Sequence, residues 1–112
     1  MEHLLPEEIE TTEPVENVHA AYLIEGDRMS SQYFEMEPGA VIPEHDHPHE
    51  QIGFLFEGEV TISVEDGTRT VSAGDGFYFE GGESHSVENT GGTTARGVDM
   101  FSPPRPEDYW SE

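Results

Sequence analysis

The sequence predicts an all-β fold, either a small sandwich or a barrel, and three observations support this prediction. Short runs rich in β-branched and aromatic residues alternate with turn signals along most of the chain. No segment keeps the 3.6-residue periodicity of an amphipathic helix. The chain has 112 residues, a length that supports one compact domain and excludes two nested ones. We therefore expect a single β-domain built around one core.

A series of short strands is expected, each separated from the next by a turn signal. The breaks contain pairs such as Gly26-Asp27, Pro38-Gly39 and Gly81-Gly82. Strands this short at this spacing are typical of sandwiches and barrels rather than of βαβ units. The expected strands span residues 18–24, 32–36, 51–56, 60–64, 68–71, 76–79, 84–87 and 94–101.

The strongest hairpin signal is Asp66-Gly67, between the expected strands 60–64 and 68–71. A type I′ turn requires positive φ at both central residues, a conformation that Asp and Gly accept. We therefore predict an antiparallel hairpin with a type I′ turn centred on Asp66-Gly67.

The two ends of the chain differ in composition from this strand-rich middle. Residues 1–17 carry six glutamates and two prolines, which predicts an extended acidic arm. Residues 103–112 contain Pro103, Pro104 and Pro106, and proline cannot donate to a β-ladder, so this tail is not a central strand. We expect an arm at 1–17, a β-barrel at 18–102 and a proline-rich tail at 103–112 that packs on the barrel.

The charge of the chain is strongly one-sided. It has 25 Asp plus Glu against 4 Lys plus Arg, a formal net charge of −21 at pH 7. A surface this anionic repels phosphate backbones and anionic lipids, so we expect neither nucleic-acid binding nor membrane binding. High charge also suits a disordered chain, but 6 Phe, 4 Tyr and 1 Trp can fill a core. The absence of lysine favours the acidic surface of a protein adapted to strong salt, which screens the repulsion.

The sequence also limits chemistry and location. It contains no cysteine, which excludes disulfides, thiolate metal sites and cysteine nucleophiles. No apolar run approaches the ~20 residues of a membrane span. The acidic start Met1-Glu2-His3 is not that of a signal peptide. We therefore expect a cytoplasmic protein.

Histidines near the middle of the chain form the first candidate site. His45, His47 and Gln51 lie at positions i, i+2 and i+6, which share one face of an extended chain if Pro48 keeps the register. His85 opens a later expected strand, after a glycine turn. Three imidazoles with one oxygen donor are typical of a catalytic metal site that keeps open positions. The alternative is a solvated histidine loop in an acidic surface, and His85 argues against it.

Two segments of the sequence resemble the two motifs that define cupins. The first runs from Gly39 to Gly58 and the second from Gly74 to Asn89. The resemblance implies a double-stranded β-helix, or jelly-roll, barrel that forms a homodimer. It also implies one bound divalent first-row metal, Ni, Zn, Fe or Mn. The implied metal ligands are His45, His47, Gln51 and His85.

Two positions depart from the cupin pattern. Glu80 replaces the usual proline, a change that we expect to alter only a turn. Gln51 replaces the usual glutamate ligand, so the ligand set is neutral and leaves the double positive charge of the metal uncompensated. A metal held in this way is a stronger Lewis acid for an anionic substrate.

A narrower resemblance comes from residues near the first motif and from the end of the last expected strand. The run HDHPHEQIG from His45 to Gly53, followed by DMFSPPR from Asp99 to Arg105, resembles the small pectin-degradation cupins. Those proteins help to linearise 4,5-unsaturated uronates from pectin and alginate breakdown to 5-keto-4-deoxyuronates. The resemblance implies the same activity on a small anionic sugar, with Asp99, Phe101 and Arg105 facing the substrate.

The chemistry of these three residues suits such roles. Asp99 and Phe101 are two apart on one expected strand and share a face. Asp99 is then a general acid–base, Phe101 an apolar wall for the sugar, and Arg105 a bidentate clamp for the carboxylate. Each has a simpler alternative. Asp99 is then a solvated acid, Phe101 belongs to the core, and Arg105 pairs with Glu107 or Asp108.

The expected strand 51–56 bears apolar residues on both faces. Ile52, Phe54 and Phe56 alternate with a second row that contains Gly53 and Leu55. A second subunit or the N-terminal arm would cover the outer row.

Two further functions fit the same sequence. The same ligands around Fe(II) leave positions for O₂, as in cupin dioxygenases, and turnover without oxygen consumption would separate the two activities. The third candidate is a module that senses a metal or a sugar and catalyses nothing.

Overall fold

The structure is a computed structural model, and it describes residues 1–105. Within them the chain forms ten strands and one 3₁₀ turn, so the all-β prediction is confirmed. No helix in this range has the length and apolar character needed to span a bilayer. The predicted tail at 103–112 lies mostly outside the described residues. The elements are η1 (Pro6–Glu8), β1 (Thr12–Val15), β2 (Val18–Glu25), β3 (Ser30–Met36), β4 (Val41–His45), β5 (Glu50–Glu57), β6 (Glu59–Val64), β7 (Gly67–Ser72), β8 (Gly76–Phe79), β9 (His85–Glu88) and β10 (Ala95–Ser102).

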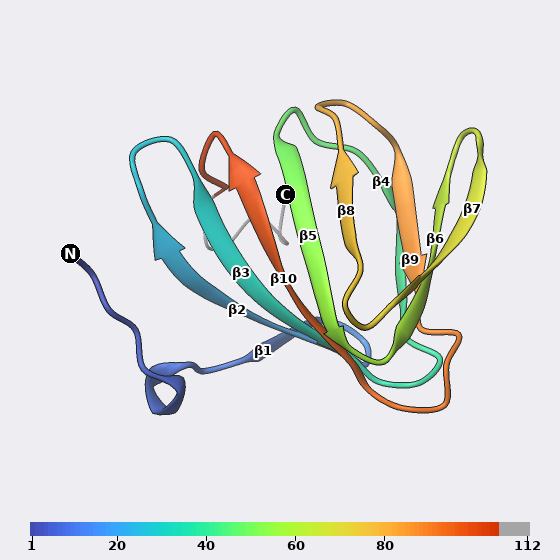
Figure 1. Cartoon of the computed structure of the whole chain (residues 1–112), viewed down its shortest axis with the longest axis horizontal. Helices are drawn as coiled ribbons and strands as arrows, with labels where there is room; N and C mark the ends of the chain where they lie inside the picture. The colour runs from blue at the N-terminus through green and yellow to red at the C-terminus, as the bar shows by residue number, and fades with distance from the viewer. Residues whose placement is uncertain (106–112) are drawn as a thin grey trace.

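The strands form two antiparallel sheets (Figure 1). The larger sheet has the order β1-β2-β3-β10-β5-β8, and the smaller has the order β4-β9-β6-β7. Strands that are distant in sequence lie side by side, since β10 pairs with β3 on one side and with β5 on the other. Two antiparallel sheets with such crossing connections make a jelly roll.

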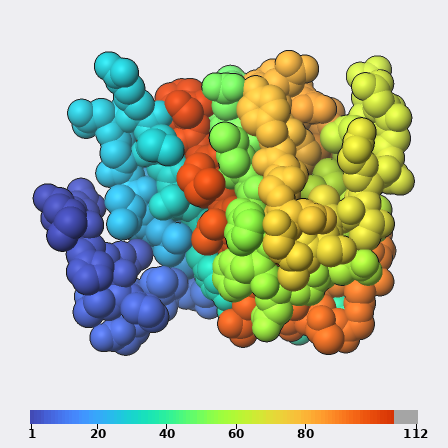
Figure 2. Space-filling model, viewed as in Figure 1, coloured from blue at the N-terminus to red at the C-terminus, as the bar shows by residue number. Residues whose placement is uncertain are grey.

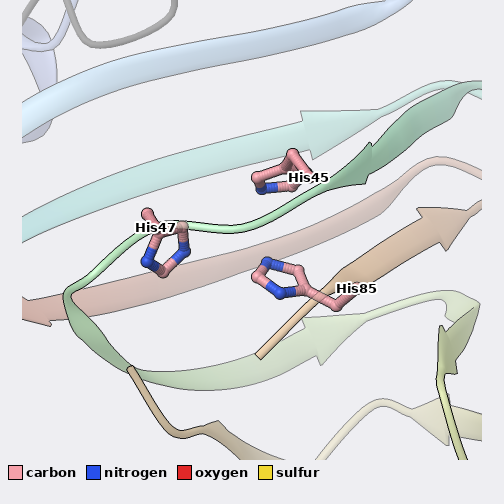
Figure 3. A group of neighbouring side chains, drawn as sticks. All are labelled: His45, His47 and His85. Carbon is pink, nitrogen blue, oxygen red and sulfur yellow. The ribbon is translucent and has the colours of Figure 1, made fainter. Parts of the chain in front are cut away.

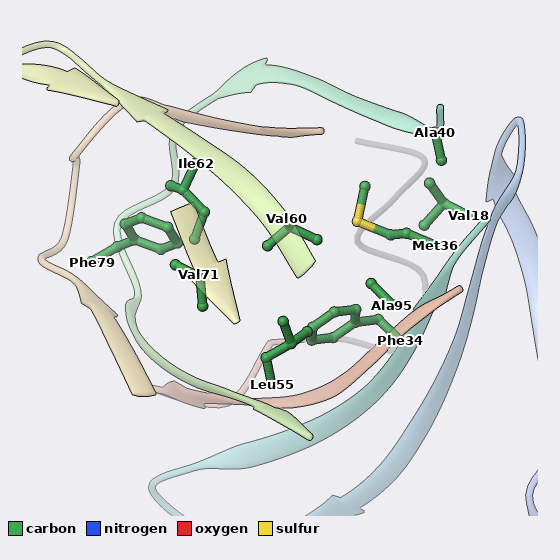
Figure 4. Packing of buried hydrophobic residues seen from close by; sticks show 10 residues of the cluster. All are labelled: Val18, Phe34, Met36, Ala40, Leu55, Val60, Ile62, Val71, Phe79 and Ala95. Carbon is green, nitrogen blue, oxygen red and sulfur yellow. The ribbon is translucent and has the colours of Figure 1, made fainter. Parts of the chain in front are cut away.

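The core lies between the two sheets (Figure 4). Alternation turns every second side chain of a strand inward, and in β3 this row consists of Ser30, Gln32, Phe34 and Met36, all buried. Phe34 and Met36 belong to the apolar cluster, whereas the first two are polar. The change from apolar to polar inward-facing residues also occurs on the neighbouring strand, because β10 places Asp99 opposite Gln32.

The interior of the barrel therefore has an apolar end and a polar end. Leu55 and Ala95 lie in the apolar cluster, while Gln51, His85 and Asp99 are buried polar groups. Burying a polar group costs free energy unless another group satisfies it. The polar end of the interior is therefore where we look for a functional site.

Glycines at two positions make room for aromatic rings. A Cβ on Gly53 would lie 2.0 Å from Cζ of Phe77, and a Cβ on Gly97 would lie 2.5 Å from Cζ of Phe34. The rings thus occupy the space that a larger side chain would need. Any residue with a Cβ at these two positions would displace an aromatic ring.

Two strands that the sequence did not predict complete the sheets. β1 lies within the predicted arm and pairs with β2, and β4 pairs with β9. Each contains a proline, Pro14 in β1 and Pro43 in β4. Both are edge strands, where proline is tolerated because one side of the strand needs no ladder partner.

The hairpin predicted at Asp66-Gly67 is present, but its turn is of another type. Val64 pairs with Gly67, so Glu65 and Asp66 form the two-residue loop. Neither of them has a positive φ, whereas Gly67 has a φ of 139°. The type I′ prediction is therefore wrong, because the glycine follows the turn instead of standing at its centre.

Candidate metal centre

Three histidines come together at the polar end of the barrel interior (Figure 3). His45 ends β4, His47 lies in the connection to β5, and His85 begins β9. His45 and His85 are also register partners in the smaller sheet. Each ring offers one nitrogen atom, and these atoms lie within 4.8 Å of one another.

His45, His47 and Gln51 come together because the chain turns at residues 46–49. They do not share one face of a single extended segment. β4 ends at His45 in the smaller sheet, and β5 begins at Glu50 in the larger sheet. The chain therefore crosses between the sheets at this point. The alternation argument from the sequence is wrong about this geometry, although His45, His47 and Gln51 do meet at one end of the barrel.

A backbone carbonyl fixes each imidazole. In every case the oxygen belongs to a residue two positions away in the chain, and Nδ1 lies 2.9 Å from it in His45, 3.0 Å in His47 and 2.8 Å in His85. A carbonyl only accepts hydrogen bonds, so Nδ1 carries the proton and donates it. In the neutral ring Nε2 then holds a lone pair, the arrangement found in metal-binding histidines.

Gln51 adds an oxygen donor from β5. Its side chain is buried, and its Oε1 lies 3.0 Å from Nε2 of His47. With the proton of His47 on Nδ1, that Nε2 and this Oε1 are both acceptors. Two acceptors that face each other at this distance suit two ligands of one cation.

Burial keeps two of the rings neutral. It lowers the pKa of His85 to about 4, and it lowers the pKa of His47, where the charge of Arg105 adds to the effect. Both imidazoles are therefore in the metal-binding form at pH 7. Phe79 stacks on His85 with 3.9 Å between ring centroids and 7° between ring planes, which fixes the orientation of that ring.

The donor set fits one divalent first-row metal. Neutral nitrogen and oxygen ligands suit Zn, Ni, Fe or Mn, and four of them leave positions open for a ligand. His47 is 5% exposed and His85 is 2% exposed. The alternative of a solvated histidine loop is therefore wrong.

A buried carboxyl group stands beside this cluster. Asp99 on β10 is 7% exposed, and its Oδ1 has no hydrogen-bond partner among residues 1–105. Burial raises the pKa of Asp99 to about 7, while a hydrogen bond from Gln51 and the charge of Arg105 oppose the rise. The alternative of a solvated acid is wrong. A buried acid that titrates near neutrality can both donate and accept a proton.

Phe101 and Arg105 lie at the same end of the barrel. Phe101 is buried, and its ring centroid lies 5.7 Å from that of His47. The guanidinium carbon of Arg105 lies 5.2 Å from the centroid of the Phe101 ring. The backbone N–H of Arg105 donates to Oγ of Ser30 at 2.9 Å, which ties this part of the chain to β3.

Apart from His47, these groups line one small cavity of about 50 Å³. That volume holds a few water-sized groups, enough for an ion and the reacting atoms of a ligand. Glu107 and Asp108, the other partners considered for Arg105, lie outside the described residues. The polar lining consists of Gln32, His45, Gln51, His85, Asp99 and Arg105.

Comparison with known proteins decides the family. The family model described as the cupin domain matches residues 32–101. This chain belongs to the cupin family. The matched range contains both motif segments, 39–58 and 74–89, so the resemblance inferred from them is confirmed, and the jelly-roll barrel is the cupin fold.

A curated protein is similar to part of the chain. Germin-like protein 5-1 from Oryza sativa subsp. japonica is 34% identical over 80 residues, which is 66% of this cupin. The match covers 36% of that relative, so the chain corresponds to about a third of its length.

Solved structures share the fold over nearly the whole chain. KdgF from Halomonas sp. has a TM-score of 0.87 at 22% identity, covering 96% of this cupin and 97% of that chain. An RmlC-like cupin from Shewanella frigidimarina has a TM-score of 0.84 at 24% identity, covering 94% of each. The polyketide cyclase RemF from Streptomyces resistomycificus has a TM-score of 0.82 at 22% identity, covering 99% and 91%. Identities this low show a common fold, on which many functions are built.

Two residues of this cupin site were not predicted from the sequence. Gln32 lines the cavity, and Phe79 stacks on His85. Gln32 did give a signal, because it has the inward parity of Phe34 on β3, and a polar residue in an inward row needs a partner. Phe79 gave no sequence signal for a role in the site, because a phenylalanine in a strand is ordinarily part of the core.

Proposed function

We propose that this cupin is a metal-dependent enzyme that converts 4,5-unsaturated uronate monosaccharides to linear 5-keto-4-deoxyuronates. One observation carries the proposal: the buried Asp99 and the partly buried Arg105 line the same cavity as His45 and His85, two of the three converging histidines. A proton-transfer group, an anion-binding group and a metal-binding group in one cavity suit a small anionic sugar that reacts by proton transfer. The resemblance to the pectin-degradation cupins supports the same assignment.

The metal would be held by His45, His47, His85 and Gln51. When bound, a divalent ion supplies Lewis-acid polarisation of a substrate oxygen. The four ligands carry no negative charge, so the centre as a whole stays positive and attracts an anionic sugar. This attraction matters in a chain with a net charge of −21, which otherwise repels such a substrate.

Asp99 would carry the protons of the reaction. Opening the cyclic hemiacetal breaks the bond between C1 and the ring oxygen, removes the proton of the C1 hydroxyl, protonates the ring oxygen and leaves an enol. Ketonisation then adds a proton at C4 and removes the enol proton, so the product is an isomer of the substrate. Each step moves one proton between two positions of the same molecule, which a single carboxyl group can do. The unpartnered Oδ1 of Asp99 supports this role.

Arg105 would bind the carboxylate of the sugar. A guanidinium group binds a carboxylate through two parallel hydrogen bonds. Its backbone hydrogen bond to Ser30 and its contact with the Phe101 ring hold Arg105 in place before any ligand binds. Phe101 would then both support the guanidinium group and form the apolar wall of the pocket.

The test is an assay of the conjugated C=C absorbance of a 4,5-unsaturated uronate monomer in molar KCl. Metal-free protein receives Zn, Ni, Fe(II) or Mn in turn, and the spontaneous rearrangement is subtracted. We expect metal-dependent acceleration with no oxygen consumption. No acceleration with any of these metals would contradict the proposal, and in that case oxygen consumption would favour a dioxygenase and binding alone a sensor.

A further inference from the structure

A second group of side chains with metal-binding atoms lies on the first three strands of the larger sheet. It consists of Glu13 on β1, His19 on β2 and Glu37, which follows the last residue of β3. An imidazole nitrogen and two carboxylate oxygens of this group lie within 4.8 Å of one another. We call these three residues the outer cluster.

The sheet separates the outer cluster from the metal centre inside the barrel. Val18 and Ala20 are buried, so alternation turns His19, between them, to the outer face of the sheet. None of the three residues is among the described residues that line the cavity beside the metal centre. In Figure 2 the N-terminal residues, coloured blue, form one edge of the molecule, beside β2. The outer cluster is therefore a separate group of donors.

The turn between β1 and β2 holds both glutamates of the outer cluster. The backbone N–H of Asn17 donates to Oε2 of Glu13 at 2.8 Å. The carbonyl oxygen of Asn17 accepts a hydrogen bond from the backbone N–H of Glu37 at 2.9 Å. Asn17 has a φ of 64°, in the left-handed region that asparagine adopts more readily than most residues. One turn residue thus connects Glu13 and Glu37, and His19 follows it by two positions.

The charge of the outer cluster fits a divalent cation. Nε2 of His19 lies 2.7 Å from Oε2 of Glu37, but a protonated imidazole supplies one positive charge against two carboxylates. A divalent ion would balance both. Glu35, the register partner of His19, is not needed as a ligand, because its Oε1 lies 3.8 Å from the guanidinium group of Arg96.

The donor types indicate which cation fits. Calcium and magnesium take oxygen ligands, whereas an imidazole nitrogen suits zinc, nickel or copper. Ligands of a tetrahedral zinc ion, with bonds of ~2.0–2.2 Å, lie ~3.4 Å apart. Small side-chain rotations bring donors that already lie within 4.8 Å to this spacing. Three protein ligands leave the fourth position for water.

We propose that Glu13, His19 and Glu37 form a second divalent-metal site, best suited to zinc, that fastens β1 to β2 and β3. β1 is a four-residue edge strand that contains Pro14, so a link through Glu13 would secure a short strand. An ion that binds the folded chain and not the unfolded chain also raises the stability of the fold.

The test is calorimetric titration of the full chain with ZnCl₂ in molar KCl. His47→Ala with His85→Ala removes two ligands of the metal centre, and this double variant should still bind one zinc ion per chain. Adding His19→Ala should lower the affinity of that remaining site by more than the ~100-fold that loss of an outer hydrogen-bond partner costs. The matched controls, added to the same double variant, are His3→Ala and Glu88→Gln. Both positions are exposed and lie outside the two groups of metal-binding side chains, so zinc binding should not change.

Thermal unfolding gives a second readout. Zinc should raise the Tm of the double variant and calcium should not, and His19→Ala should abolish the rise. A folded double variant that binds no zinc, or that binds it equally with and without His19, would overturn the proposal. If circular dichroism shows that the double variant is unfolded, wild type and His19→Ala are compared instead. Equal numbers of bound zinc ions in these two proteins would then overturn the proposal, whatever the activity on uronates.

Discussion

His85 reaches the metal centre from a different strand and a different part of the sequence than His45 and His47. We expect His85→Ala to lower the affinity for Zn or Ni by more than the ~10–100-fold that loss of an outer hydrogen-bond partner costs. The barrel should remain folded, because its apolar cluster, and not the ion, makes up the core. Metal analysis after dialysis and calorimetric titration measure the effect. His3→Ala is the control, because His3 is exposed and lies in neither group of side chains that could hold a metal. Unchanged metal content in His85→Ala would contradict the four-ligand assignment.

Substitution of Arg105 tests substrate binding separately from the chemical step. Loss of a charge-assisted hydrogen bond worth ~1.5–3 kcal/mol corresponds to about 10- to 200-fold in binding. We therefore expect Arg105→Ala to raise KM by this factor with a small effect on kcat. Arg105→Lys should recover part of the loss, since lysine keeps the charge but not the planar fork. The control is Arg69→Ala on β7, which should leave KM unchanged. A fall in kcat at constant KM would show that Arg105 is not the clamp.

At the scale of elements, the contact between β5 and β8 depends on a glycine. Gly53→Ala would place a Cβ 2.0 Å from the ring of Phe77, so the ring must move in a packed interior. We expect a loss of ~1–3 kcal/mol in the free energy of unfolding, measured by denaturant titration in molar KCl. Gly53→Ala with Phe77→Leu should recover part of it. Gly92→Ala is the control, because nothing lies within 4 Å of the added carbon. Equal stability of the two single variants would contradict this packing.

The elements that the sequence predicts well are those whose signals are local. The hairpin of β6 and β7 has alternating residues and a turn pair, and its strands are found within one residue of the expected ranges. β1 and β4 gave no such signal because Pro14 and Pro43 oppose strand formation, and only pairing at a sheet edge permits it.

In the candidate site, too, the features with local sequence signals were predicted and those that depend on tertiary packing were not. His45 and His47 follow from spacing, and His85 from the second motif. The crossing between sheets at 46–49 depends on tertiary packing and could not be inferred from alternation. The burial of Asp99 could not be predicted either, because nothing in the neighbouring sequence distinguishes this acid from the other acidic residues among the 25. Its position inside follows from the register that sets it opposite Gln32 and Gly53.

The molecule as a whole carries a net charge of −21 on 112 residues, and its 4 arginines are too few to pair 25 acidic residues. Self-repulsion acts over ~10 Å at 0.1 M salt and ~3 Å at 1 M. We expect the Tm to rise by on the order of 10 °C from dilute buffer to molar KCl, since 1 kcal/mol corresponds to ~4–8 °C in a small domain. Sucrose at equal osmolality is the control, because it does not screen charge. A Tm independent of KCl would contradict the adaptation to salt.

The central claim is that Asp99 moves the proton in a metal-dependent reaction of an unsaturated uronate. The most direct measurement is kcat of Asp99→Asn beside wild type, with bound metal determined on the same samples. Asparagine keeps the shape of the side chain but cannot exchange a proton, so kcat should fall by about 10²–10⁴-fold. Metal content should not change, because Asp99 is not a proposed ligand. A folded, metal-loaded Asp99→Asn variant with full activity would contradict the claim.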